Sequence, residues 1–441
     1  MKAVYICTGW KKNVIQFHVK LQLWAKIKSR FHYKYVHSSI DMLMVHSNVA
    51  LVDRQNLLVD RKFHDGMSFM VRNLGRRIVS VHPKWSGTNP IMDKVNVPLA
   101  DLPYDVLVLD IDGRGKLTRS STTLLKDAVA NAELVVGQSM GAAKIARLAK
   151  VPYMTVEEYD LPTQIVAGTA QLKSPLRKLV RGLRIRLDYY TKQARDSQYA
   201  LGIHSNGYPA YNAVAHLNNN RLLYLDSRLL AASVIASDEL ERRVSTLGAR
   251  PLRLLYSGRL TAMKGVLDAV KATIICQRAG MNVELSLYGQ GEDQEQIENL
   301  ISTAPYPHLI TVHHAVEFPK LMAIAKSFDL FVCCHVQSDP SCTYVESFGA
   351  GLPIVGYNNA MWSALEAHAA AGIVCKMHDV NGLANSIVNL SLDHVRLAQL
   401  SRNARKFAVE HSFEVEIDKR IGSFRAALSQ AIDPSRSPSI L

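Results

Sequence analysis

Three polar segments in the second half of the chain carry residue types that could bind a nucleotide. The first, Ser257-Gly258-Arg259-Leu260, follows an apolar run, and Lys264-Gly265 precedes a helical pattern. Gly258 permits a sharp turn, and Arg259 and Lys264 would offer two cations to a diphosphate near a helix N-terminus. An ordinary solvated loop with two basic residues is the alternative interpretation.

The second segment, Tyr288-Gly289-Gln290-Gly291-Glu292, also follows an apolar run and precedes a helical pattern. It lacks the third glycine of a dinucleotide-binding fingerprint. We therefore interpret it as a tight strand-to-helix turn that lines the same crevice.

The third segment, residues 337–356, is the most specific of the three. An apolar run leads into a polar loop, and a helix is predicted to begin near Ser341 or Cys342 and to end before Gly351. A helix N-terminus offers amide donors to a phosphate. Glu346, in the first turns, has two carboxylate oxygens that can accept from a ribose diol.

The order of these segments resembles glycosyltransferase family 4, over roughly residues 251–411. The resemblance implies that Arg259 and Lys264 hold the donor diphosphate and that Glu346 holds the donor ribose. It further implies that amides at the helix start bind the distal phosphate, and these belong to Cys342, Thr343 and Tyr344. Its nucleoside-binding positions correspond to Gly289, Gly291 and His313, although a histidine at a strand end is often structural.

The sequence departs from the family at one catalytic position. Ser338 stands eight residues before Glu346, where the family has a first glutamate that lies against the donor sugar, and Asp339 follows it. Asp339 could replace that glutamate with a shorter side chain. Alternatively, it could cap the following helix.

Apolar runs alternate with helical patterns almost throughout, which is typical of parallel α/β architecture. We predict the α/β GT-B fold, with two Rossmann-like, doubly wound domains facing across a cleft. The expected segments are a basic extension or domain start at 1–40, an acceptor-binding domain at 41–225, a linker at 226–250, a nucleotide-sugar-binding domain at 251–411, and a returning helix with a tail at 412–441. The strands expected in the second domain are Leu252–Tyr256, Asn282–Tyr288, Ile310–His313, Leu330–Cys334, Ile354–Val355 and Ile373–Cys375.

The resemblance is weaker before residue 200, where the family's usual glycine-rich loop is absent. Candidate acceptor contacts are Gln138 and Ser139 in a strand-to-helix turn, together with His46. A structural role is the alternative for each of them.

The formal net charge of +14 is concentrated in two segments. Residues 1–37 carry +8, and residues 173–195 carry +7. In the second segment, apolar residues recur at helical spacing among basic ones, chiefly Arg177, Lys178, Arg181 and Arg184. This pattern predicts contact with an anionic membrane surface, and a helix packed on the core with a solvated basic face is the alternative. No recognition motif supports nucleic-acid binding.

Cysteine use and hydropathy indicate a compartment. The six cysteines form no C-x-x-C pair, no apolar run reaches 18 residues, and the N-terminus lacks the charge order of a signal peptide. We expect a cytoplasmic protein, peripheral on the inner face of the membrane. No metal-ligand spacing is present, and the resemblance implies a metal-independent reaction with no cofactor.

The resemblance to glycosyltransferase family 4 implies a retaining hexosyltransferase. Its donor would be a UDP- or GDP-sugar, and its acceptor a hydroxyl of a glycan or lipid-linked molecule in polysaccharide or glycolipid synthesis. One alternative is another GT-B activity, such as sucrose- or trehalose-type synthesis or the epimerisation of nucleotide sugars. A further alternative is a degenerate relative that binds nucleotide sugars as a scaffold in a polysaccharide assembly complex.

Overall fold

The computed structural model describes residues 39–432, with the exception of residues 88–92, 114 and 138. The chain divides into two compact units, residues 1–133 and residues 134–441. The basic segment 1–37 and the candidate Gln138 therefore lie outside the described residues.

The first unit contains three parallel strands and a small antiparallel sheet. The parallel strands lie in the order β1-β4-β6, and their bounds are β1 (Ile40–Val45), β4 (Ile78–Pro83) and β6 (Asp105–Leu109). The antiparallel sheet comprises β2 (Leu51–Asp53), β3 (Asn56–Asp60) and β5 (Lys94–Pro98). Helices α2 (Arg61–Leu74) and α3 (Arg119–Ala130) complete the unit. The small sheet was not predicted, because its strands are short and β5 is exposed at alternate positions.

The second unit begins within a further set of parallel strands. These strands are neighbours in chain order: β7 (Ala132–Val136), β8 (Tyr153–Glu157), β9 (Ile203–Asn206) and β10 (Arg221–Tyr224). Their helices are α4 (Ala142–Ala149), α5 (Leu161–Thr169), α6 (Pro175–Asp188), α7 (Ala194–Gln198) and α8 (Tyr208–Ala213). The long helix α17 (Phe413–Ile432) packs against them, since Ser423 Oγ lies 2.9 Å from His204 Nε2 and Phe424 lies against the same imidazole.

The remaining strands form a six-stranded, wholly parallel sheet in the order β13-β12-β11-β14-β15-β16. They are β11 (Leu252–Ser257), β12 (Val283–Tyr288), β13 (Ile310–His313), β14 (Leu330–Cys333), β15 (Ile354–Tyr357) and β16 (Gly372–Cys375). Its helices are α9 (Ser237–Val244), α10 (Val266–Arg278), α11 (Gln294–Ile301), α12 (Phe318–Ala325), α13 (Thr343–Gly349), α14 (Ala360–Ala369), α15 (Val380–Leu392) and α16 (His394–Glu410). The predicted α/β fold class is confirmed.

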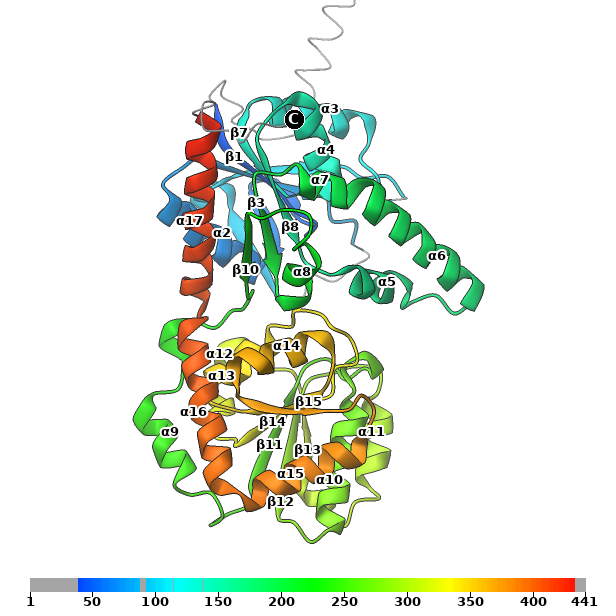
Figure 1. Cartoon of the computed structure of the whole chain (residues 1–441), viewed down its shortest axis with the longest axis vertical. Coiled ribbons are helices and arrows are strands. Elements are labelled where there is room, and N and C mark those ends of the chain that lie inside the picture. Colours follow the sequence, from blue (N-terminus) through cyan, green and yellow to red (C-terminus); the bar gives the residue numbers. More distant parts are fainter. Residues whose placement is uncertain (1–38, 88–92, 114, 138, 433–441) are drawn as a thin grey trace, which may run out of the picture. The chain divides into compact units, whose positions relative to one another are not determined.

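Helices cover both faces of this sheet (Figure 1). Leu254 of β11 packs into a core with α10 and α15, whereas the next residue, Leu255, packs into a second core with α12, α13 and α14. Strands buried on both faces appear as continuous apolar runs, and β14 and β15 are buried at every position. All six predicted strands are present. The strand order reverses between β11 and β14, and ligands of such sheets bind at the carboxyl ends of the strands at this point.

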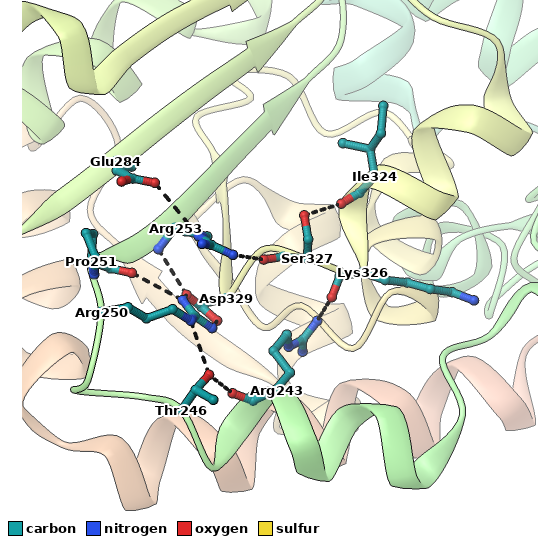
Figure 2. Close-up of polar contacts among 10 residues, drawn as sticks. All are labelled: Arg243, Thr246, Arg250, Pro251, Arg253, Glu284, Ile324, Lys326, Ser327 and Asp329. Carbon is teal, nitrogen blue, oxygen red and sulfur yellow. Dashed lines mark hydrogen bonds and ion pairs between the residues drawn. The ribbon is translucent and has the colours of Figure 1, made fainter.

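A buried carboxylate stabilises the end of the same sheet at which its strands begin. Asp329, at the start of β14, accepts hydrogen bonds from both Nη atoms of Arg250 at 2.6 and 2.8 Å and from the amide of Arg253 at 3.0 Å (Figure 2). Its side chain is 1% exposed. A buried charge requires such partners, so this contact joins the chain that enters β11 to the strand beside it.

Arg243 supports the same region from α9. Its guanidinium donates to the carbonyl oxygen of Lys326 (Figure 2) and to those of Ala350 and Gly351. Burial lowers the pKa of Arg243 to about 10. Two of these carbonyls follow the last turn of α13, where a cation also offsets the negative end of the helix dipole.

In the part of the chain that the structure describes, no helix combines the length and the hydropathy needed to span a bilayer.

Asp329→Ala is expected to lower the free energy of unfolding by about 3–5 kcal/mol, because it removes a buried carboxylate and leaves the partly buried guanidinium of Arg250 and the amide of Arg253 without their acceptor. Urea denaturation followed by tryptophan fluorescence measures the change. Glu241→Ala is the matched control, since it removes an equally bidentate but exposed pair with Arg402 and should cost less than about 1 kcal/mol. Equal losses in the two variants would contradict this account.

Candidate functional site

Two loops meet at the carboxyl ends of β11 and β12. The amide of Gly258 donates to the carbonyl of Tyr288 at 3.0 Å, and that of Leu260 donates to Gln290 at 3.1 Å. A Cβ on Gly289 would overlap the carbonyl oxygen of Gly258, and one on Gly291 would overlap that of Leu260. The two glycines are therefore required for the close approach of the loops, which gives the Gly-x-Gly segment a structural role at this position.

A third loop is joined to the same place through Gly265. Its backbone is left-handed, with φ of 63°, and a Cβ there would overlap the carbonyl oxygen of Cys334 at the end of β14. Lys264, just before it, is 7% exposed. Close packing of Gly265 thus places the Lys264 side chain beneath the loop that follows β14.

The ammonium group of Lys264 forms an ion pair with Asp339. Lys264 Nζ lies 3.1 Å from Asp339 Oδ2, and the two side chains are 9% and 20% exposed. The other oxygen, Oδ1, is buried and has no hydrogen-bond partner among the described residues. Asp339 therefore lies beside the cation that the sequence assigns to the diphosphate.

The positions of Ser338 and Asp339 in the structure distinguish between the two predicted roles of Asp339, as a replacement for the family's first glutamate or as a helix cap. Ser338 Oγ accepts from the amide of Ala360 at 2.9 Å, at the first residue of α14. Helix α13 begins at Thr343, and its N-cap residue, Cys342, makes no side-chain cap hydrogen bond. Asp339 instead faces Lys264, so the helix-capping interpretation of Asp339 is not what the structure shows.

Glu346, on α13, is held by Arg228. Arg228 Nε lies 3.0 Å from Oε1 and Nη2 lies 3.3 Å from Oε2, while the Glu346 side chain is 9% exposed. The guanidinium also lies 4.3 Å from the ring centre of Phe318. Sequence reasoning missed Arg228, because nothing in the local pattern of residues 225–235 indicates a partner 118 residues away.

Two further residues that the sequence reasoning missed lie near this group. Burial, with Lys264 and Arg259 nearby, holds the pKa of His335 well below its usual value, and its Nδ1 atom is buried without a hydrogen bond within the described ranges. Burial also raises the pKa of Tyr159, with Glu158 and Asp339 adding to the rise and Arg259 opposing it. Tyr159 follows β8, so its proximity to Asp339 depends on tertiary structure alone.

His313, at the end of β13, stacks on Tyr288 with ring centres 4.4 Å apart. Its carbonyl accepts from the amide of Gly289 at 3.1 Å. His313 thus lies at the predicted edge of the crevice, beside the Gly-x-Gly turn, while its predicted contact with a base stays a prediction.

Of the other predicted residues, Arg259 lies at the same loop, whereas Ser139 and His46 lie on other elements. Arg259 is exposed on the loop after β11, and its carbonyl accepts from Tyr256 Oη at 3.0 Å. Ser139 begins a short 3-10 turn before α4. His46 belongs to the first unit, where it packs against Phe63 and His82.

Helix α6 presents its apolar residues to solvent. Exposed fractions lie between 56% and 69% for Leu176, Leu179, Val180, Leu183, Leu187 and Tyr190. The helix packs on α5 through other residues, since Gly182 faces Ile165 and Gly168 faces Ile185. The predicted basic residues Arg177, Lys178, Arg181 and Arg184 are also exposed. The alternative of an apolar face packed on the core is therefore wrong.

No cluster of three or more metal-ligating side chains occurs in the described part of the chain. The cysteines described there, Cys276, Cys333, Cys334, Cys342 and Cys375, form no disulfide.

Comparison with known proteins agrees with this geometry. A family model described as "Glycosyl transferases group 1" matches residues 237–407. This segment is therefore similar to glycosyl transferases group 1. It contains every residue of the crevice named above except Arg228 and Tyr159.

Curated relatives match less than half of the chain. A D-inositol 3-phosphate glycosyltransferase from Arthrobacter sp. (strain FB24) is 24% identical over 194 residues, which are 43% of this chain and 46% of the relative. A glycogen synthase from Mycobacterium tuberculosis is 27% identical over 159 residues, or 35% of this chain and 38% of the relative. The matches thus span less than half the length of these proteins.

Among solved structures, Anabaena HepE in complex with UDP is similar over 88% of this chain and 100% of its own, with a TM-score of 0.61 and 14% identity. A likeness at this identity shows the fold, which is the predicted GT-B fold.

Gly289→Ala is expected to lower the melting temperature by several degrees, because a Cβ there would force β11 and β12 apart at a cost of about 1–3 kcal/mol. Gly422→Ala on α17 is the control. A Cβ at that position meets nothing within 4 Å, so the better helix propensity of alanine should leave stability unchanged or raise it. Differential scanning fluorimetry compares the two, and an unchanged melting temperature for Gly289→Ala would show that the loops tolerate separation.

Proposed function

We propose that this protein is a retaining hexosyltransferase that transfers a sugar from a UDP- or GDP-sugar to a hydroxyl of a glycan or lipid-linked acceptor. The observation that carries the proposal is two ion pairs, Lys264–Asp339 and Arg228–Glu346. Lys264 follows β11, and Asp339 and Glu346 follow β14, the two strands at the switch point of the parallel sheet. The family of the domain supports glycosyl transfer, and the relative of similar fold was solved with UDP.

The diphosphate would lie between Arg259 and Lys264. The sheet topology places both residues on loops after β11, and two cations offset the charge that develops on a departing diphosphate. In the proposed reaction these side chains supply the charge stabilisation, and the backbone amides of Cys342, Thr343 and Tyr344 add donors to the distal phosphate.

Asp339 would face the sugar once the diphosphate occupies Lys264. Its Oδ1 atom has no hydrogen-bond partner within the described residues, and a carboxylate oxygen is a strong acceptor for a sugar hydroxyl. In this assignment Asp339 takes the place of the family's first glutamate, while Ser338 has a structural role at the start of α14.

The transfer would keep the configuration of the anomeric carbon. The bond from that carbon to the phosphate oxygen breaks, and a bond to the acceptor oxygen forms on the same face. The acceptor proton passes to the departing phosphate oxygen. The contribution of the protein is then orientation and charge stabilisation.

Lys264→Ala is expected to weaken UDP binding about tenfold or more, because a charge-assisted hydrogen bond to phosphate is lost. Asp339→Asn should instead strengthen binding of UDP alone, since no carboxylate then competes for Lys264, and it should slow sugar transfer. Isothermal titration with UDP and GDP measures binding. Lys271→Ala, which removes an exposed lysine on α10, is the control.

Failure of UDP, GDP and their sugars to raise the melting temperature would contradict the proposed nucleotide site. The scaffold alternative is favoured by Ser338 at the family's glutamate position. It predicts nucleotide-sugar binding with no turnover, so donor hydrolysis by the wild type that is lost in Glu346→Ala would exclude it.

We further propose that α6 binds the anionic inner face of a membrane. Its exposed apolar stripe is flanked by exposed arginines and lysines, and this combination suits insertion between anionic headgroups. The acceptor would then be reached at the membrane surface, which fits a lipid-linked acceptor.

Leu179→Glu combined with Leu183→Glu is expected to reduce binding to phosphatidylglycerol vesicles at least tenfold, because two exposed apolar side chains that would insert into the bilayer become charged. Leu392→Glu combined with Val395→Glu is the control, since these residues are 69% and 83% exposed on α15 and α16, away from α6 in the sequence. Flotation with phosphatidylglycerol and with phosphatidylcholine vesicles measures binding. Equal binding of both vesicle types, or a changed oligomeric state of the α6 variant in light scattering, would contradict a membrane role.

A further inference from the structure

Arg228 comes from the segment that connects β10 to α9, outside the three polar segments of the crevice. Its guanidinium meets both oxygens of Glu346, which is the planar, two-point geometry that arginine forms best with a carboxylate. Each carboxylate oxygen has two lone pairs. One on each oxygen therefore stays available to accept from the two hydroxyls of a ribose diol while Arg228 holds the other side.

The position of Arg228 is determined by its neighbours on both sides. Leu229 is fully buried and packs against Gly349 in the last turn of α13, and its carbonyl accepts from the amide of Phe413 at 2.7 Å. Ser227 is also buried, and Phe318 covers the face of the guanidinium. The segment is thus held against the helix that carries Glu346, which leaves the guanidinium little freedom to leave the carboxylate.

We propose that Arg228 is a positioning residue for the donor ribose: it holds the Glu346 carboxylate in the orientation that accepts from the ribose 2′- and 3′-hydroxyls. This inference rests on the proposed function of the site. It predicts that Arg228 acts only through Glu346, so that its loss affects discrimination of the ribose rather than attraction of the diphosphate.

The test compares ribose with 2′-deoxyribose nucleotides on the full-length protein. Dissociation constants for UDP, 2′-deoxy-UDP, GDP and 2′-deoxy-GDP are measured by isothermal titration. The wild type is expected to prefer the ribonucleotide about tenfold, since a hydrogen bond to a charged group is lost with the 2′-hydroxyl. Arg228→Ala should bring this ratio close to one, and Arg228→Lys, which retains the charge without the two-point geometry, should give an intermediate ratio.

Two further variants distinguish a positioning role of Arg228 from a general loss of structure. In a Glu346→Ala background, Arg228→Ala should leave the ratio unchanged, because the residue through which it acts is absent. Arg402→Ala, which removes an exposed arginine–glutamate pair on α16, should keep the wild-type ratio. Circular dichroism verifies that each variant is folded.

The outcomes distinguish the inference from the proposed function. A wild type that prefers ribonucleotides, together with an Arg228→Ala variant that keeps the same preference, would overturn the inference alone. A wild type that binds none of the four nucleotides would refute the proposed site, and the inference with it.

Discussion

The candidate site depends on a close approach of backbone segments that only glycine permits. Gly289 and Gly291 bring the loop after β12 onto the backbone of Gly258 and Leu260, and Gly265 brings the loop after β11 onto Cys334 at the end of β14. Adjacent parallel strands twist relative to one another, so their end loops diverge unless they are tied together. These contacts hold three strand ends in one place, and the side chains that they carry converge as a result.

The charged side chains of Lys264 and Glu346 are largely shielded from water. Lys264 and Glu346 both have side chains that are 9% exposed, and an isolated charge at such a position would be costly. Each therefore has a partner of opposite sign, Asp339 for Lys264 and Arg228 for Glu346. The two pairs differ in consequence. At the proposed site, a diphosphate would compete with Asp339 for the ammonium group of Lys264. A ribose would share Glu346 with Arg228, because a carboxylate accepts more hydrogen bonds than one guanidinium donates to it.

The same unit carries a second feature of a different kind. Helix α6 packs through Gly182 and Ile185, yet its larger apolar residues face solvent. Exposed apolar surface next to basic residues has a cost in water that a soluble partner or a lipid surface would remove. Donor chemistry and surface attachment would thus be assigned to separate elements, the strand ends of the six-stranded sheet and a single helix outside it.

The sequence by itself determined the parallel α/β architecture and the order of the crevice segments. Strands buried on both faces appear as apolar runs, and glycines required for close approach appear at the strand ends, so both features are readable locally. Gly289 and Gly291 illustrate this, although their part in the loop contact was not foreseen. The small antiparallel sheet of β2, β3 and β5 was missed: β2 has three residues and β5 has no buried residue, so only β3 contributes buried side chains.

Only the tertiary structure decided which charges meet. Lys264 and Asp339 are 75 residues apart, and Arg228 and Glu346 are 118 apart, so no local pattern links the members of either pair. It also decided that Ser338 supports α14 and that the apolar face of α6 is uncovered. Apolar residues at helical spacing show that a helix has an apolar face. Whether other parts of the protein cover that face depends on where distant segments of the chain lie, and local residue spacing does not predict this.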